Sequence, residues 1–145
     1  MTSSKFGGVS DPLLDAYRRT TYRAELSSGT VDVRIGERCP TIDALLREHG
    51  RLIAAQITAH NPMSRRLPVR ENRRRHAALQ RLVADLGCPA WPGMNVADDG
   101  GWPDEAAMLV LPASLTMARR IAADFEQRAI VVVRQDEAAR LDVLR

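Results

Sequence analysis

The sequence has few cysteines, few aromatic residues and a single lysine. Its 145 residues include 2 cysteines, 2 tryptophans, 2 tyrosines and 2 phenylalanines. Cys39 and Cys88 stand far apart with no CxxC spacing, which argues against a disulfide framework. No apolar run approaches the roughly 20 residues that span a bilayer, and residues 1–10 lack the apolar segment of a signal peptide. We therefore expect a cytoplasmic protein without a membrane segment.

Signatures of catalysis and of cofactor binding are also missing. The chain has no Gly-x-Ser-x-Gly nucleophile motif and no glycine loop that would hold a phosphate. The three histidines, His49, His60 and His76, show no metal-ligand spacing. We predict neither a cofactor nor a metal, and the sequence identifies no reaction, partner or oligomeric state.

The composition is that of a soluble globular domain. Hydrophobic residues make up 45% and charged residues 27%, and the formal net charge is +3. Of the 21 basic residues, 20 are arginine and only Lys5 is lysine. This mildly basic balance permits nucleic-acid binding without requiring it. We expect a mobile N-terminus over residues 1–10 and a single domain over residues 11–145.

Helix and strand patterns alternate along the chain, which predicts an α/β (α+β) domain. Its expected form is a single mixed β-sheet of about five to seven strands with three to four packed helices. Asp11 is expected to cap the first helix and Thr41 the second. Proline interrupts residues 88–96, which favours an edge strand or a loop there. The expected helices cover 12–19, 41–49, 68–86 and 115–126, and the expected strands cover 22–26, 31–35, 52–58, 107–111, 129–133 and 141–144.

The expected topology brings distant segments to one edge of the sheet. A helical crossover predicts that strand 52–58 is parallel to strand 90–96. A tight turn makes 107–111 antiparallel to 90–96, and a second crossover makes it parallel to 129–133. The end of strand 52–58 should therefore lie beside the starts of strands 107–111 and 129–133.

Polar side chains come from each segment that should meet at this edge. They include the carboxylate of Glu105, which we expect to pair with Arg75. A helix N-terminus nearby offers unpaired N–H groups. Together they predict a pocket for a polar or anionic small ligand, with the arginine neutralising its charge. The same side chains also suit architectural roles, such as an Asx turn at Asn61. The candidate residues are Thr58, Asn61, Asn72, Arg75, Trp102, Glu105 and Gln127.

Four short motifs occur in order and together resemble a known family. They are Ile57–Pro62, Glu71-Asn72, Gly101–Glu105 and Phe125–Ala129. The set is similar to a bacterial family known as domain of unknown function 3293, over about residues 16–134. The resemblance supports the pocket residues and implies no particular activity. Asp104, Ala106 and Arg128 depart from the family pattern.

Two other functions are compatible with the sequence. An arginine-rich stretch could bind the phosphate backbone of RNA, although no aromatic residue interleaves with it to stack on bases. Alternatively, the protein could be an accessory domain that acts through a protein surface, with the polar cluster purely architectural. The arginines of the stretch are Arg65, Arg66, Arg70, Arg73 and Arg74.

Overall fold

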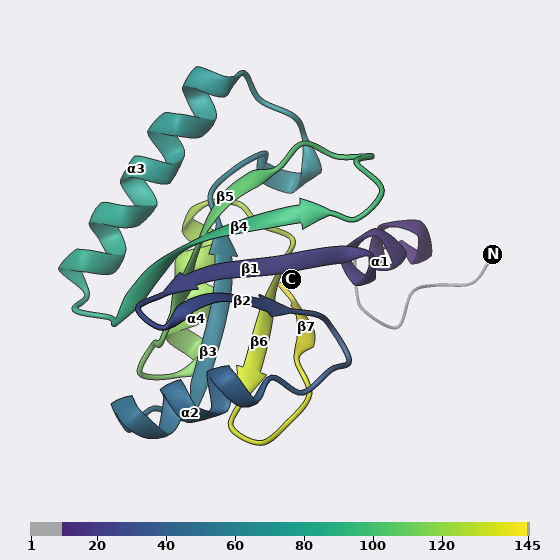
Figure 1. The fold of residues 1–145 in the computed structure, drawn as a ribbon. Helices are drawn as coiled ribbons and strands as arrows, with labels where there is room; N and C mark the ends of the chain where they lie inside the picture. The colour runs from purple at the N-terminus through teal and green to yellow at the C-terminus, as the bar shows by residue number, and fades with distance from the viewer. Residues whose placement is uncertain (1–9, 145) are drawn as a thin grey trace.

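The computed structural model describes residues 10–144, which form one seven-stranded sheet with four α-helices (Figure 1). The predicted α+β class and the numbers of strands and helices are confirmed. The mobile segment predicted at residues 1–10 lies outside the described residues except for Ser10. The elements are α1 (Asp11–Arg18), β1 (Thr20–Leu26), β2 (Gly29–Val33), α2 (Pro40–His49), β3 (Ile53–Thr58), a 3₁₀ turn (Pro62–Ser64), α3 (Val69–Asp85), β4 (Ala90–Ala97), β5 (Glu105–Val110), α4 (Leu115–Asp124), β6 (Ala129–Arg134) and β7 (Arg140–Val143).

Two of the four described helices, α1 and α4, begin with a side-chain N-cap. The Ser10 hydroxyl accepts a hydrogen bond from the Leu13 N–H, so Ser10, not Asp11, caps α1. Helix α2 follows Cys39 without a side-chain cap, so the expected cap at Thr41 is also wrong; Pro40 starts the helix at its first position instead. Within residues 10–144, no helix is long and apolar enough to cross a membrane.

The strand order is β2-β1-β4-β5-β3-β6-β7, and all six pairings among the described residues are antiparallel. The expected mixed sheet is therefore wrong in its pairing, although the strand directions are as expected. Strands β3 and β4 do run in the same direction, but β5 lies between them. Likewise β3 separates β5 from β6. The crossover helices set the directions of these strands without making them neighbours.

Strand β4 is an interior strand, not the expected edge or loop. It pairs with β1 on one side and β5 on the other, despite Pro92. The ladder with β1 ends at the pair Ala24↔Gly93, so Pro92 lies just beyond it. A proline is tolerated where its missing N–H has no ladder partner.

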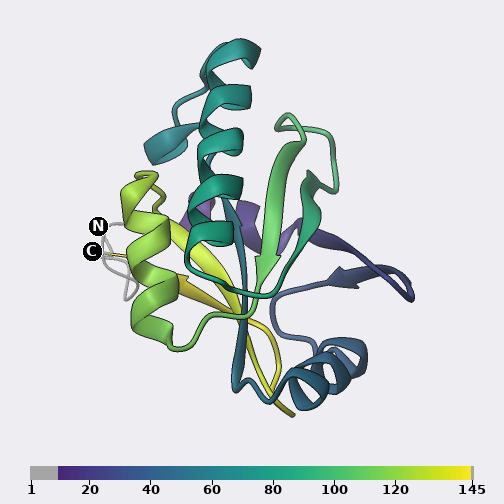
Figure 2. The ribbon, with the colours of Figure 1, turned by 90° about the vertical axis from the view of Figure 1, so that its left-hand side faces the viewer.

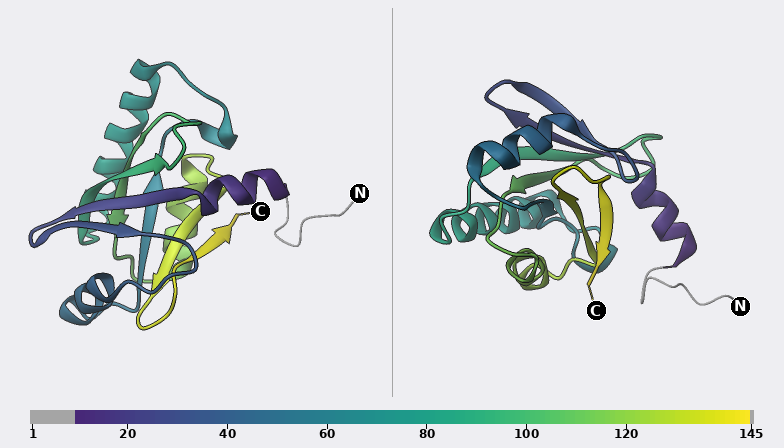
Figure 3. Two further views of the ribbon diagram at one scale, coloured as in Figure 1. Left: turned by 45° about the vertical axis from the view of Figure 1, so that its right-hand side comes forward. Right: turned by 90° about the horizontal axis from the view of Figure 1, so that it is seen from below.

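The sheet curls, so that β1 and β2 cross in front of β3 and β6 (Figure 1). Helices α3 and α4 cover the outer face, while α2 and the β1–β2 hairpin lie on the other side of β3 (Figures 2 and 3). Alternate residues of β3 serve the two faces. Ile53, Ala55 and Ile57 belong to the core with α3 and α4, whereas Ala54 belongs to the inner core with α2. Every residue of β3 is buried as a result.

Candidate functional site

The inner face of the sheet is filled at one end and hollow at the other. Near α2, Ala54, Leu109 and Val133 pack into the inner core. Towards the opposite ends of the same strands, a cavity of about 260 Å³ opens between the sheet and α1. The two-residue period that directs Ala54 inward also directs Gln56 and Thr58 inward, and both line this cavity.

Five of the seven residues predicted for the pocket line the cavity, and two do not. Asn72 and Arg75, on α3, lie outside its wall. The five lining residues are Thr58, Asn61, Trp102, Glu105 and Gln127.

Glu105 is the only carboxylate of the wall that is not exposed among the described residues; Asp99, which also lines the cavity, is exposed. Asn61 Nδ2 donates to Glu105 Oε2 at 2.6 Å, and Trp102 Nε1 donates to the same oxygen at 3.0 Å. Burial raises the pKa of Glu105, while these two hydrogen bonds act in the opposite direction. Within residues 10–144, no hydrogen bond reaches Oε1, so this oxygen is free to accept one from a ligand.

Asn61 joins the end of β3 to the start of α3. Its Oδ1 accepts hydrogen bonds from the Leu67 N–H and from Asn72 Nδ2, each at 2.9 Å. Its own N–H donates to Asn72 Oδ1 at 3.0 Å. Asn72 therefore supports the site through Asn61 and does not face the cavity itself.

The turn after Asn61 has an uncommon backbone conformation. Asn61, Met63 and Ser64 all have positive φ, at 49°, 51° and 60°. Asparagine tolerates this region, but methionine and serine adopt it rarely. Ser64 lines the cavity, and the Met63 N–H is held by the Glu126 carbonyl at 2.8 Å. Such conformations persist only where surrounding contacts impose them, and they cluster at functional sites.

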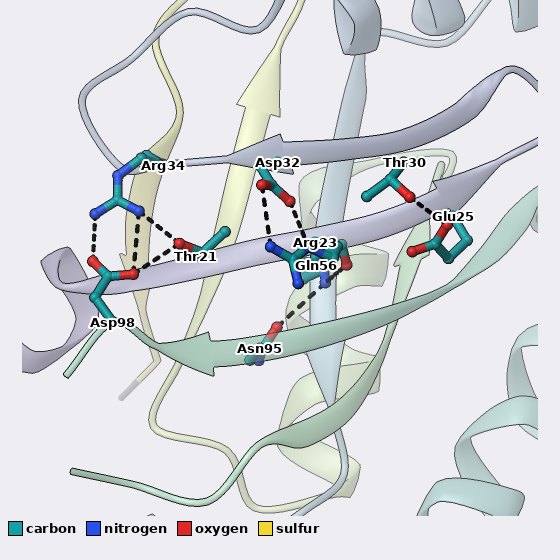
Figure 4. Close-up of polar contacts among 9 residues, drawn as sticks. All are labelled: Thr21, Arg23, Glu25, Thr30, Asp32, Arg34, Gln56, Asn95 and Asp98. Atoms are coloured by element: carbon teal, nitrogen blue, oxygen red, sulfur yellow. Dashed lines mark hydrogen bonds and ion pairs between the residues drawn. The ribbon is translucent and has the colours of Figure 1, made fainter. Parts of the chain in front are cut away.

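Gln56 reaches across the curled sheet from β3. Its Nε2 donates to the Arg23 carbonyl at 2.8 Å and to Asn95 Oδ1 at 3.3 Å (Figure 4). A Cβ on Gly93 would lie 2.6 Å from this nitrogen, so glycine at that position admits the contact. A backbone carbonyl can only accept, which fixes Nε2 as the group facing Arg23. Oε1 of Gln56 is left without a hydrogen bond from any described residue.

Gln127 is oriented in the same way. Its Nε2 donates to the His60 carbonyl at 3.0 Å and to the Phe125 carbonyl at 3.2 Å. The oxygen of this amide, Oε1, accepts no hydrogen bond within the described part of the chain. Thr58, in contrast, is satisfied: its Oγ1 donates to the Ala106 carbonyl and accepts from the His60 N–H.

Arg75 does not pair with Glu105, which corrects our expectation. Its Nε donates to the Ala59 carbonyl at 2.6 Å, and its Nη2 donates to the Phe125 carbonyl. Its Nη1 lies 3.6 Å from Glu126 Oε1. The guanidinium thus ties α3 to the ends of β3 and α4. Because Arg75 does not line the cavity, it cannot neutralise a ligand there.

Arg128 and two tyrosines line the cavity and were not among the predicted residues. Tyr17 and Tyr22 contribute aromatic surface, and the Tyr22 hydroxyl donates to the Tyr17 carbonyl at 3.1 Å. Burial raises the pKa of Tyr17, and raises that of Tyr22 strongly. Arg128 Nε is buried without a hydrogen-bond partner among residues 10–144. Gln56, which also lines the cavity, had a signal in the sequence, because it is a polar residue within a mainly apolar strand.

The arginines of the nucleic-acid hypothesis lie outside the cavity. All five are exposed, and none forms an ion pair with an acidic side chain in the described structure. The guanidinium of Arg66 lies 5.9 Å from the centre of the Trp102 ring. No group of three His, Cys, Asp or Glu side chains within residues 10–144 is arranged to hold a metal.

Comparison with known proteins identifies the family. Residues 57–130 match the model of the family described as protein of unknown function DUF3293. The chain belongs to this family. All four motifs on which the resemblance was based fall inside the DUF3293 match, as do Asn61, Glu105 and Gln127. No curated protein and no solved structure matches the chain.

Proposed function

We propose that the protein binds a small polar molecule in the cavity on the inner face of the sheet. The observation that carries the proposal is the hydrogen bonding of the Glu105 carboxylate. Two donors hold one carboxylate oxygen in place, and the other oxygen has no protein partner within the described residues. A half-buried carboxylate with one free oxygen at a cavity wall is suited to accept a hydrogen bond from a ligand.

The surroundings of Glu105 support the same function. Asn61, which positions the carboxylate, belongs to a turn with three positive φ values, and it is anchored by further hydrogen bonds. Of the six tyrosine, tryptophan and phenylalanine residues in the sequence, Tyr17, Tyr22 and Trp102 line this one cavity. A wall of apolar and aromatic surface with a few fixed polar groups is typical of small-ligand sites.

Thermal unfolding in the presence of a panel of polar metabolites tests the proposal. Glu105→Gln keeps the shape of the side chain and removes its charge, and Glu71→Gln makes the same change on exposed Glu71. A ligand at about 100 times its Kd stabilises the folded state by about 2.7 kcal/mol. We expect this stabilisation in the wild type and in Glu71→Gln, and its loss in Glu105→Gln. If a ligand stabilises Glu105→Gln as much as the wild type, its binding does not depend on Glu105, and the proposed site in the cavity is wrong.

Nucleic-acid binding is the second candidate, favoured by the exposed arginines without ion-pair partners in the described structure. Its electrostatic contribution should weaken steeply with added salt. Retention on RNA that falls with salt, and that is lost in a combined Arg70→Gln, Arg73→Gln and Arg74→Gln variant, would support it. Unchanged retention of this variant on RNA would exclude nucleic-acid binding through these arginines.

A further inference from the structure

Two opposite charges face the cavity and do not pair with each other. Among residues 10–144, one carboxylate oxygen of Glu105 has no hydrogen-bond partner, and neither does the buried Nε of Arg128. No ion pair within 4.0 Å joins the two side chains. The cavity's other charged residues, Arg19 and Asp99, are exposed to solvent. Partly buried charges are costly without partners, so Glu105 and Arg128 each have capacity for a ligand group of opposite charge.

The strand order explains why these two charges remain apart. Glu105 begins β5, and Arg128 immediately precedes β6. Strand β3 lies between β5 and β6. With neighbouring strands about 4.8 Å apart, the two backbones are separated by roughly 9–10 Å. A ligand that carries both a positive and a negative group could contact both side chains.

The uncharged polar groups of the wall favour a ligand group that is rich in hydrogen-bond donors. Gln56 and Gln127 each use their amide nitrogen on backbone carbonyls, so both present an acceptor oxygen without a partner in the described chain. Together with Glu105 Oε1, the wall offers three acceptor oxygens. A primary ammonium group has three donors and no acceptor, and the aromatic residues Tyr17 and Trp102, which line the cavity, also favour a cation.

We propose that the ligand of this cavity is a small zwitterion of the amino-acid type. Its ammonium group lies against Glu105, its carboxylate lies against Arg128, and the free amide oxygens of the wall accept further hydrogen bonds. This inference rests on the proposed small-ligand function and specifies its ligand class. The cavity of about 260 Å³ suits a molecule of this size, because sites for drug-sized ligands occupy about 300–1,000 Å³.

Calorimetric titration with matched compounds tests the two charge contacts separately. The series consists of free amino acids, the amines that lack the carboxylate, and the acids that lack the amino group: phenylalanine, phenethylamine and 3-phenylpropionate; and leucine, isoamylamine and 4-methylpentanoate. A hydrogen bond to a charged group contributes about 1.5–3 kcal/mol, which is about tenfold or more in affinity. We expect at least one amino acid to bind about tenfold or more tightly than each of its one-charge analogues.

Two variants assign each charge to a residue. In Glu105→Gln, the amino acid should bind no better than the acid that lacks the amino group. In Arg128→Gln, it should bind no better than the corresponding amine. Glu71→Gln and Arg81→Gln change exposed residues of α3 and should leave affinity unchanged. Circular dichroism of each variant confirms folding before titration.

The outcomes separate this inference from the broader function. Equal affinity for amino acids and their one-charge analogues, or unchanged affinity in Arg128→Gln, would overturn the zwitterion assignment. If a polyol or another uncharged compound binds in a Glu105-dependent manner and no amino acid does, small-ligand binding stands and the zwitterion is rejected. If no compound of any class binds, both proposals fail.

Discussion

Replacing Asn61 with alanine should destabilise the protein more than most single substitutions. The residue is 5% exposed, and its side chain takes part in three hydrogen bonds: one to the Glu105 carboxylate, one from the Leu67 N–H and one from Asn72 Nδ2. A hydrogen bond to a charged group contributes about 1.5–3 kcal/mol and a neutral one about 0.5–1.5 kcal/mol. Alanine at the positive φ of Asn61 adds roughly 1 kcal/mol.

These contributions belong to one network and are not additive. We therefore expect Asn61→Ala to lower the free energy of unfolding by about 3–5 kcal/mol. At roughly 2–4 °C per kcal/mol for a chain of this size, the midpoint of thermal unfolding should fall by about 10 °C. Urea unfolding followed by circular dichroism gives the free energy directly. A loss below about 1 kcal/mol would refute the view that this network holds the turn.

The aspartate variant isolates the contact with Glu105. Asn61→Asp keeps the acceptor oxygen for Leu67 and Asn72 and tolerates the positive φ, but it places a carboxylate against the Glu105 oxygen. Two adjacent carboxylates raise the pKa of one of them in the folded state, so this variant binds a proton on folding. Its stability relative to wild type should be highest near pH 4 and fall as the pH rises. A pH-independent difference between the two proteins would show that residue 61 does not contact Glu105.

Two further predictions concern the frame around the cavity. Gly93→Ala places a Cβ 2.6 Å from Gln56 Nε2 and 2.7 Å from the Arg23 carbonyl oxygen, and overpacking should lower stability by about 1–3 kcal/mol in urea unfolding; wild-type stability would refute the close approach. Burial, with His76 nearby, lowers the pKa of His60 to about 4, below the value of about 6.5 in an unfolded chain. The neutral native form therefore contributes stability that is complete above about pH 6.5 and is lost as the pH falls towards 4. The stability of wild type relative to His60→Gln should decrease over that range, and a constant difference would contradict the shift.

Strand directions could be predicted from the sequence because they depend on local features. A long helix between two strands brings the chain back in the same direction, and a tight turn reverses it. These two rules place the end of β3 beside the start of β5, and the pair Thr58↔Ala107 confirms that position. The contact between Asn61 and Glu105 follows from this geometry and not from any motif.

Strand order could not be predicted in the same way. The β4–β5 hairpin inserts β5 between β3 and β4, a choice set by packing between residues far apart in the sequence. The partners of Arg75 were missed for a related reason. Backbone carbonyls at the ends of β3 and α4 accept its hydrogen bonds, and carbonyls carry no side-chain signature. Pairing by charge alone therefore pointed to Glu105.

The contrast between the two ends of the inner face argues that the cavity serves a purpose beyond folding. At the α2 end, inward positions of the same strands carry Leu109 and Val133, which close the core. At the other end, inward positions carry Gln56 and Glu105, although apolar residues of similar volume at buried polar sites are often neutral or stabilising. Stability alone does not account for a carboxylate with one free oxygen beside a cavity. The proposed ligand binding accounts for it, because a binding site needs fixed polar groups whose remaining hydrogen-bonding capacity is left open.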